Sequence, residues 1–234
     1  MMMKYWFMDI IVKPTTFFVF DLDDTLYQEI DFLRSAYKHI AATLEPAIKI
    51  SVYNEMIDRY HKKENVFNWI IDQYRDHLGE FDINWLIRTY REHLPDIKLS
   101  AETASFLENV RSLGIRAGLI TDGRSVTQRN KLGALGLREM FTGIIISEEF
   151  GSEKPDERNY LYFATKFPGS DFYYFGDNTR KDFLTPGKLG WKTVCIKDRG
   201  ENIHKQQFDG SLIPGYVVNG FAEIRLQKGV ATKS

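Results

Sequence analysis

Short apolar runs that alternate with longer amphipathic stretches constrain the fold of this chain more than any other feature. The first run, Thr16–Phe20, is aromatic and β-branched and ends abruptly in acidic residues, as a buried strand does. Similar runs follow at Ile115–Ile120, Gly143–Ile146, Phe172–Phe175, Lys192–Ile196 and Tyr216–Val218. Helix-like stretches of crossover length separate them at Ala101–Leu113, Ser125–Leu135, Asp156–Phe167 and Arg180–Leu189. This alternation predicts an α/β fold with a Rossmann-like parallel sheet covered by helices on both faces.

The region between the first two runs differs from the rest because it contains amphipathic stretches and no convincing strand. Its helical stretches are rich in Tyr, Phe, Trp and Ile and lie at Ile50–Tyr60, Val66–Leu78 and Ile83–Leu94. We therefore expect a small helical domain at residues 27–95, inserted into an α/β core made of residues 1–26 and 96–234.

Composition narrows the classes of partner. The 234 residues include 31 Lys and Arg against 32 Asp and Glu, which gives a formal net charge of -1. Without a basic field, neither a nucleic-acid polymer nor a membrane surface is an expected partner. The single cysteine, Cys195, cannot form an intrachain disulfide, which is compatible with a cytoplasmic protein.

The first twelve residues are apolar and aromatic, but they do not have the pattern of a secretion signal. Asp9 interrupts them and no small-residue cleavage site follows. The stretch is also too short to span a bilayer. An extra edge strand and a poorly ordered leader both stay open for it, as does the oligomeric state.

Polar residues stand where the apolar runs end. Asp21, Asp23, Asp24 and Thr25 follow the first run, Thr121, Asp122 and Gly123 the second, Lys154 lies in the loop after the third, and Asp177 and Asp182 follow the fourth. An acidic residue after a strand is usually a turn or a helix cap, and a lone lysine is usually a solvated one. Ligands of parallel α/β sheets gather beyond the carboxyl ends of the strands, however. The ordered occurrence of all these groups at consecutive strand ends therefore favours one site.

The chemistry of this set points to phosphate and a divalent cation. Asp21, Asp23 and Asp177 offer the hard oxygen ligands that Mg²⁺ prefers. Crowded carboxylates repel one another unless a cation neutralises them, which Mg²⁺ and Lys154 would both do. The same positive charges would shield a phosphate dianion from an anionic nucleophile. The hydroxyl of Thr121 is suited to phosphate oxygens.

These residues resemble the four motifs of the haloacid dehalogenase superfamily. The motifs are similar to the segments Asp21-Leu22-Asp23-Asp24-Thr25-Leu26, Leu119-Ile120-Thr121-Asp122-Gly123, Gly151-Ser152-Glu153-Lys154-Pro155 and Gly176-Asp177-Asn178-Thr179-Arg180-Lys181-Asp182. All four stand in family order over a core of about residues 16–196, and their combination is far more specific than any one of them.

The resemblance implies a role for each motif residue. Asp21 would be the nucleophile that accepts the phosphoryl group, and Asp23 would protonate the leaving oxygen and then activate water. Asp21, Asp177 and the backbone carbonyl of Asp23 would hold Mg²⁺ as the cofactor. The phosphoryl group and substrate would be bound by Thr121, Asp122 and Lys154, with Asp182 orienting Lys154. Asp24 would tie down its loop through hydrogen bonds.

The resemblance also implies a substrate class. Dehalogenating members lack the second aspartate, so the presence of Asp23 favours a phosphatase. The insertion at residues 27–95 looks like the helical cap of a subfamily that includes phosphoglycolate phosphatase and nucleotidases, which act on small phosphorylated metabolites. We expect an enzyme that hydrolyses a small phosphomonoester, a sugar phosphate or a nucleotide.

Three alternatives stay open. A phosphosugar mutase of the β-phosphoglucomutase type resembles this chain in fold and motifs, although glycine often stands there at the position of Asp24. A phosphoacceptor switch, similar to a bacterial receiver domain, fits the order of the acidic residues badly. A catalytically silent binding module would be expected to have lost a chemical residue, and none is missing.

Overall fold

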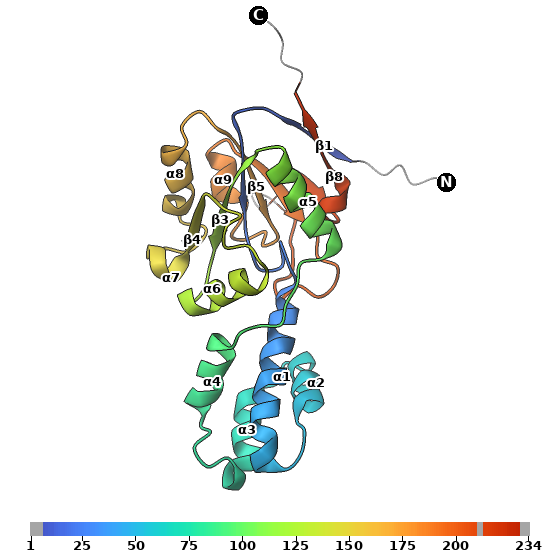
Figure 1. The fold of residues 1–234 in the computed structure, drawn as a ribbon, viewed down its shortest axis with the longest axis vertical. Helices are drawn as coiled ribbons and strands as arrows, with labels where there is room; N and C mark the ends of the chain where they lie inside the picture. Colours follow the sequence, from blue (N-terminus) through green and yellow to red (C-terminus); the bar gives the residue numbers. More distant parts are fainter. Residues whose placement is uncertain (1–6, 210–212, 230–234) are drawn as a thin grey trace, which may run out of the picture. The chain divides into compact units, whose positions relative to one another are not determined.

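The main sheet has six strands and is parallel throughout its pairings (Figure 1). The computed structural model describes residues 7–209 and 213–229. The strands are β2 (Thr16–Phe20), β3 (Arg116–Thr121), β4 (Gly143–Ile146), β5 (Asp171–Gly176), β6 (Lys192–Ile196) and β7 (Tyr216–Val218). Their spatial order is β4-β3-β2-β5-β6-β7, so the first of them in the chain lies inside the sheet. The predicted α/β fold with a parallel sheet is confirmed.

Aromatic side chains on both faces of β2 hold helices against the sheet. Phe17 and Val19 pack with Phe163 of α8 (Glu157–Lys166) in one buried cluster. On the other face, Phe18 stacks on Phe106 of α5 (Ala101–Ser112), with ring centroids 6.3 Å apart. A strand that is apolar on both faces is what a parallel sheet covered on both sides requires.

The chain clusters into two compact units. One comprises residues 1–29, 98–125 and 136–234 and contains the sheet. The other comprises residues 30–97 together with 126–135, so most of α6 (Ser125–Ala134) groups with it.

The second unit is built from amphipathic helices around one apolar core. They are α1 (Glu29–Ile48), α2 (Tyr53–His61), α3 (Val66–Tyr74) and α4 (Ile83–Glu92), with a 3-10 turn at Arg75–His77. The long helix α1 contributes Leu33, Tyr37 and Ile40 to this core. The side chains of Asn65 and Asp82 cap α3 and α4, each by accepting a backbone N–H three residues on.

Two segments differ from the sequence-based expectation. The helix expected at Arg180–Leu189 is shorter and forms only at α9 (Leu184–Lys188), because the backbone N–H groups of Lys181 and Asp182 bond back to the carbonyl of Asn178 in a turn. Near the ends of the chain, β1 (Met8–Val12) pairs with β8 (Ile224–Lys228) in a separate parallel two-stranded sheet. Part of the apolar N-terminal stretch is therefore a strand, while its residues 1–6 lie outside the described residues. The strand β8 was not anticipated.

Within the described ranges, none of the helices combines the length and the apolar character that crossing a bilayer requires. A short helix, α7 (Ser147–Phe150), follows β4, and a 3-10 turn at Phe221–Glu223 precedes β8.

Gly118 of β3 provides a test of how closely α8 packs on the sheet. A Cβ at this position would collide with the ring of Phe163. We expect Gly118→Ala to lower the free energy of unfolding by about 1–3 kcal/mol, as overpacking does. The second substitution Phe163→Leu should recover part of the loss, because the two sites are in contact. Chemical denaturation of each variant measures both effects.

Gly187→Ala is the matched control. A Cβ there meets no atom within 4 Å, and the residue lies inside α9. This substitution should leave stability unchanged or raise it by about 0.5–1 kcal/mol, since alanine favours helix over glycine. Equal effects of the two alanines would contradict the close packing of Gly118 on Phe163.

Candidate active site

The residues expected at the strand ends gather around one pocket. The strands β2, β3 and β5 are neighbours in the sheet, so the loops that follow them lie side by side. Of the predicted site residues, the pocket is lined by Asp21, Asp23, Thr121, Asp122, Lys154 and Asp177, with Asp24 beside them. Glu29, Asn178, Lys181 and His204 also line it. The remaining predicted residue, Asp182, is fully buried and contacts Lys154.

A buried ion pair joins the first and third motifs. The Nζ atom of Lys154 lies 2.7 Å from Oδ1 of Asp21, and the Lys154 side chain is only 3% exposed. Asp21 is itself held by the sheet, since its backbone N–H donates to the carbonyl of Phe175 on β5. The carboxylate of Asp21 is therefore fixed relative to both the strand and the ammonium group.

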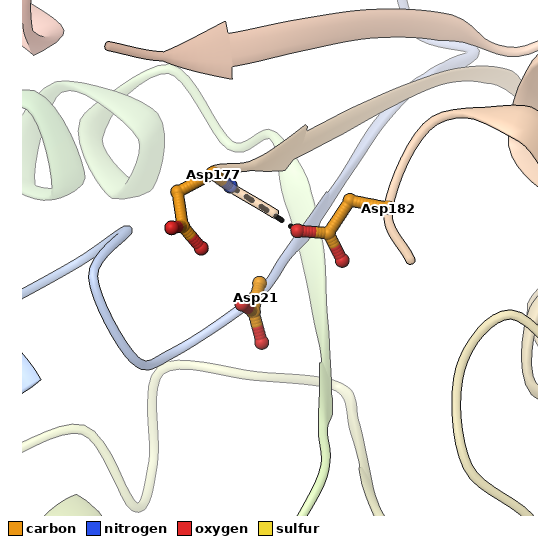
Figure 2. A group of neighbouring side chains, drawn as sticks. All are labelled: Asp21, Asp177 and Asp182. Carbon is orange, nitrogen blue, oxygen red and sulfur yellow. Dashed lines mark hydrogen bonds between the residues drawn. The ribbon is translucent and has the colours of Figure 1, made fainter. Parts of the chain in front are cut away.

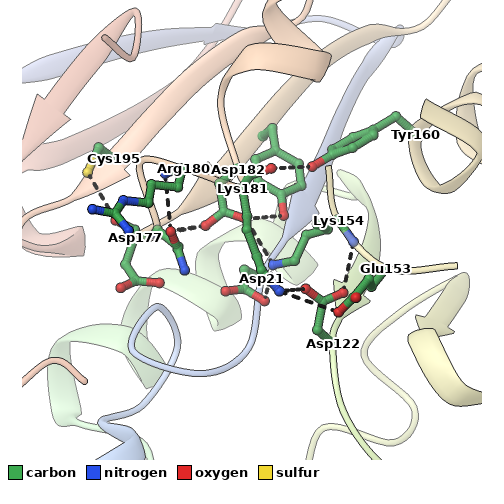
Figure 3. A network of polar contacts seen from close by, with 12 residues as sticks. Asp21, Asp122, Glu153, Lys154, Tyr160, Asp177, Arg180, Lys181, Asp182 and Cys195 are labelled. Atoms are coloured by element: carbon green, nitrogen blue, oxygen red, sulfur yellow. Dashed lines mark hydrogen bonds and ion pairs between the residues drawn. The ribbon is translucent and has the colours of Figure 1, made fainter. Parts of the chain in front are cut away.

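Asp182, which does not line the pocket, holds this lysine by a buried ion pair (Figure 3). Its Oδ1 accepts hydrogen bonds from Lys154 at 2.9 Å and from the hydroxyl of Tyr174 at 3.1 Å. Its Oδ2 accepts from the backbone N–H groups of Asp177 and Asn178. Both oxygens are thus engaged, so Asp182 is suited to orienting its neighbours rather than to binding a ligand.

This approach of Asp182 depends on a residue without a side chain. A Cβ at Gly176, the last residue of β5, would lie 2.5 Å from Oδ2 of Asp182. The glycine before the fourth-motif aspartate therefore leaves the space that the Asp182 carboxylate occupies.

The charges of the cluster do not balance within the chain. Oxygen atoms of Asp21, Asp177 and Asp182 lie within 4.8 Å of one another (Figure 2), and Lys154 is the cation that contacts two of them. If all three carboxylates were ionised, they and one ammonium would leave a net charge of about -2 in a buried place, which is costly unless a proton or a metal cation offsets it. A divalent cation has the required charge, and Asp21 and Asp177 face the pocket from which it would enter.

The pKa values of these groups reflect the same imbalance. Burial raises the pKa of Asp177 to about 9, with the neighbouring charges of Asp182 and Asp21 adding to the effect. Burial likewise holds the pKa of Asp21 well above its usual range, although Lys154 opposes the shift. For Lys154 burial alone would lower the pKa, but the two carboxylates prevail and its pKa lies well above the ordinary value. The lysine therefore stays charged.

Asp23 is oriented by a tyrosine that the sequence analysis did not single out. The hydroxyl of Tyr27 donates to Oδ1 of Asp23 at 2.5 Å. Burial raises the pKa of Tyr27 well above its usual value, so the hydroxyl keeps the proton that it donates. No feature of the sequence marks Tyr27, because its contact arises from the turn between β2 and α1.

Asp24 ties the same turn down through hydrogen bonds, as the family resemblance implied. It adopts a positive φ of 54°, which aspartate tolerates better than most residues. Its Oδ1 accepts from the backbone N–H of Glu29, and its Oδ2 accepts from that of Ile203 at 3.0 Å. These two bonds offset the backbone strain and hold the loop after β2 in place.

Asp122 and a second lysine, Lys181, form an ion pair that also lines the pocket. Asp122 Oδ1 accepts the backbone N–H of Lys154, and Oδ2 pairs with Nζ of Lys181 at 3.0 Å (Figure 3). Thr121, the last residue of β3, is 1% exposed and immediately precedes Asp122 in the chain. Lys181 was not among the predicted site residues, because a lysine next to an aspartate in the sequence is usually exposed to solvent.

The segment between β6 and β7 also reaches the site, which the sequence did not indicate. Its residue Asn202 donates from Nδ2 to Oδ2 of Asp177 at 2.9 Å, and His204 lines the pocket. Its described residues, 197–209 and 213–215, form no helix or strand and carry no recognisable motif, so only the folded chain shows their position.

Comparisons with known proteins agree with this geometry. A family model described as haloacid dehalogenase-like hydrolase matches residues 18–196. The glyceraldehyde 3-phosphate phosphatase of Methanocaldococcus jannaschii is 27% identical over 220 residues, which cover 88% of this chain and 93% of that protein. The phosphoserine phosphatase of Thermus thermophilus is 34% identical over 104 residues, which cover 44% of this chain and 41% of that protein.

A solved structure shows the same fold. The crystal structure of YfnB from Bacillus subtilis, described as a HAD-hydrolase bound to magnesium, has a TM-score of 0.58 and 21% sequence identity. The match covers 90% of this chain and 97% of that one.

The raised pKa of Asp177 predicts an unusual pH dependence for the metal-free protein. Between the ordinary value of 3.8 and about 9, the folded chain keeps a proton on Asp177 that the unfolded chain has released. The unfolding free energy contributed by this group therefore falls as pH rises through that window. Because a cation must displace the same proton, Mg²⁺ should raise the unfolding temperature more at pH 8.5 than at pH 6.

Thermal unfolding at both pH values, with and without Mg²⁺, measures this difference. The variant Asp177→Asn has no proton to lose and should show little response to Mg²⁺ at either pH. A Mg²⁺ effect of equal size at both pH values in the unaltered protein would contradict the proton on Asp177.

Proposed function

The chain belongs to the haloacid dehalogenase-like hydrolases, as its motifs indicated, and we propose that it is a magnesium-dependent phosphatase acting on a small phosphomonoester through Asp21. The observation that carries the proposal is the buried contact of 2.7 Å between Lys154 and Asp21 inside a cluster of three carboxylates. It combines a fixed anionic nucleophile with positive charge where a phosphoryl group must bind.

The donor set fits Mg²⁺. The side chains of Asp21 and Asp177 and the backbone carbonyl of Asp23 would hold it, and all three residues line the pocket. A bound Mg²⁺ supplies the charge that offsets the repulsion between Asp21 and a phosphate dianion.

The residues of the chain account for the proton and bond changes of phosphoryl transfer. An oxygen of Asp21 attacks phosphorus as the bond to the leaving oxygen breaks, and the carboxyl of Asp23 gives that oxygen a proton. Asp23, now a carboxylate, then takes a proton from water while the water oxygen attacks phosphorus. The bond between phosphorus and the Asp21 oxygen breaks in this second step, which releases inorganic phosphate and restores the Asp21 carboxylate and the Asp23 carboxyl. Tyr27 keeps the Asp23 carboxyl in one orientation through its hydrogen bond to Oδ1.

Lys154 and Thr121 would hold the phosphoryl oxygens during both steps. Lys154 is kept in place by Asp182, and its raised pKa keeps it charged. Thr121 is held at the end of a central strand, so its hydroxyl position costs no reorganisation when substrate binds. Asp122 contributes by fixing the backbone of Lys154 and by holding Lys181 at the pocket.

The relatives support a small substrate. Two relatives that match most of this chain are named glyceraldehyde 3-phosphate phosphatases, and a partial match is a phosphoserine phosphatase. Each named substrate is a phosphomonoester with a three-carbon skeleton, so this class is the first to test. The assignment of residues 27–95 as a cap and the cytoplasmic location both stay predictions.

Release of inorganic phosphate from a panel of phosphomonoesters tests the proposal. The panel would contain glyceraldehyde 3-phosphate, phosphoserine and a pyrimidine nucleoside 5′-monophosphate, each with Mg²⁺ and with EDTA. We expect activity that EDTA abolishes and that Asp21→Asn reduces to background, because the nucleophile is lost.

Asp23→Asn should slow turnover by about 10²–10⁴-fold, the usual contribution of a positioned acid and base. The control is Asp9→Asn, which neutralises an exposed carboxylate on β1 and should leave turnover unchanged. If Asp21→Asn kept the activity of the unaltered protein on every ester, the proposed nucleophile would be wrong.

A further inference from the structure

Residues 198–207, which we call the strap, follow β6 and are bonded to the loops of the candidate site. The backbone N–H of Ile203 donates to Oδ2 of Asp24, and that of Gln207 donates to the hydroxyl of Thr179, each at 3.0 Å. The strap therefore joins the loop after β2 to the loop after β5.

A turn at the start of the strap sets the position of Asn202. Oδ1 of Asp198 accepts three backbone N–H groups, from Gly200 at 2.6 Å and from Glu201 and Asn202 at 3.1 Å. Gly200 has a φ of 102°, a conformation that favours glycine. The backbone of Asn202 is thus fixed by local bonds before any ligand binds.

Two amide side chains of the strap bind Asp177, one at its carboxylate and the other at its backbone carbonyl. Asn202 Nδ2 donates to the carboxylate atom Oδ2 of Asp177 at 2.9 Å. Gln206 Nε2 donates to the backbone carbonyl of Asp177 at 3.0 Å and also to that of Ile196 at 2.8 Å. Both the backbone and the carboxylate of Asp177 are therefore oriented by the strap.

We propose that Asn202 is a positioning residue that turns the Asp177 carboxylate toward the divalent cation and so sets the affinity of the site for Mg²⁺. The inference rests on the proposed function, because it assigns Asp177 as a metal ligand. Groups that hydrogen-bond a ligating side chain commonly change metal affinity by about 10–100-fold.

The chemistry of an amide suits this position. It donates a hydrogen bond to the carboxylate without adding a positive charge, which would repel the cation. It also occupies Oδ2, so the carboxylate is presented through its other oxygen. A lysine or arginine at this place would orient Asp177 equally well but would weaken Mg²⁺ binding by its charge.

The test measures Mg²⁺ affinity on the full chain without using turnover. The unfolding temperature would be followed as a function of Mg²⁺ concentration, since a ligand that binds the folded state raises it by mass action. We compare the unaltered protein with Asn202→Ala and with Asn202→Leu, which keeps much of the side-chain volume but donates no hydrogen bond.

The matched control is Gln207→Ala in the same strap. The backbone N–H of Gln207 makes its bond to Thr179, while its side chain contacts the exposed Arg180 guanidinium at 3.2 Å. This variant removes an amide of similar size without touching Asp177. Its Mg²⁺ affinity should equal that of the unaltered protein.

We expect both Asn202 variants to bind Mg²⁺ about 10-fold more weakly or worse, with metal-free unfolding temperatures close to that of the unaltered protein. Turnover by Asn202→Ala should be low at limiting Mg²⁺ and should recover at saturating Mg²⁺. A purely structural role would not be corrected by adding metal.

The outcomes separate this inference from the proposed function. If the unaltered protein binds Mg²⁺ and Asn202→Ala binds it within twofold, Asn202 does not position Asp177 and the inference is overturned, while the phosphatase proposal stands. The inference is also overturned if Asn202→Leu binds Mg²⁺ as tightly as the unaltered protein does, because side-chain shape and not the hydrogen bond would then matter. If the unaltered protein shows no Mg²⁺ response, the metal assignment itself fails.

Discussion

The buried contact between Lys154 and the carboxylates of Asp21 and Asp182 is the interaction on which the site depends. It brings together residues that follow three different strands, and all three side chains are buried away from bulk water. Burying such a cluster costs desolvation free energy, so it adds little to the stability of the fold and serves instead to fix the positions of its side chains. The remaining negative charge creates the demand for a cation, which in turn makes the site suited to an anionic substrate.

Hydrogen bonds around the cluster hold the loops of the site in fixed positions. The carboxylate of Asp182 accepts hydrogen bonds from four donors. The backbone N–H of Asp21 donates to the carbonyl of Phe175 on β5, and both carboxylate oxygens of Asp24 accept backbone N–H groups. These contacts tie the loops of the site to β5, to Glu29 at the start of α1 and to one another. Electrostatic catalysis requires such preorganisation, because charges that move during a reaction lose part of the stabilisation that they provide.

Much of the fold was predictable because local patterns and strand ends carry the information. The runs Thr16–Phe20, Gly143–Ile146 and Lys192–Ile196 are strands with the predicted bounds. The polar residues predicted after β2, β3, β4 and β5 converge because the carboxyl ends of parallel strands share an edge of the sheet. Tyr27, Lys181 and Asn202 escaped prediction because their contacts come from turns whose course depends on tertiary structure. The short α9 has the same cause, since the Asp182 carboxylate draws the chain into a turn before the helix begins.

The place of β2 inside the sheet has a consequence for how the chain is made. β2 precedes both of its neighbours in the chain: β3 follows about a hundred residues later, and Asp171 of β5, which pairs with Thr16, follows about 155 residues later. The apolar segment Phe17–Phe20 must therefore wait until about 155 further residues have been made before both of its edges are covered. Long-range pairings of this kind slow folding and expose strands that aggregate, so this protein is expected to depend on chaperones while it emerges from the ribosome.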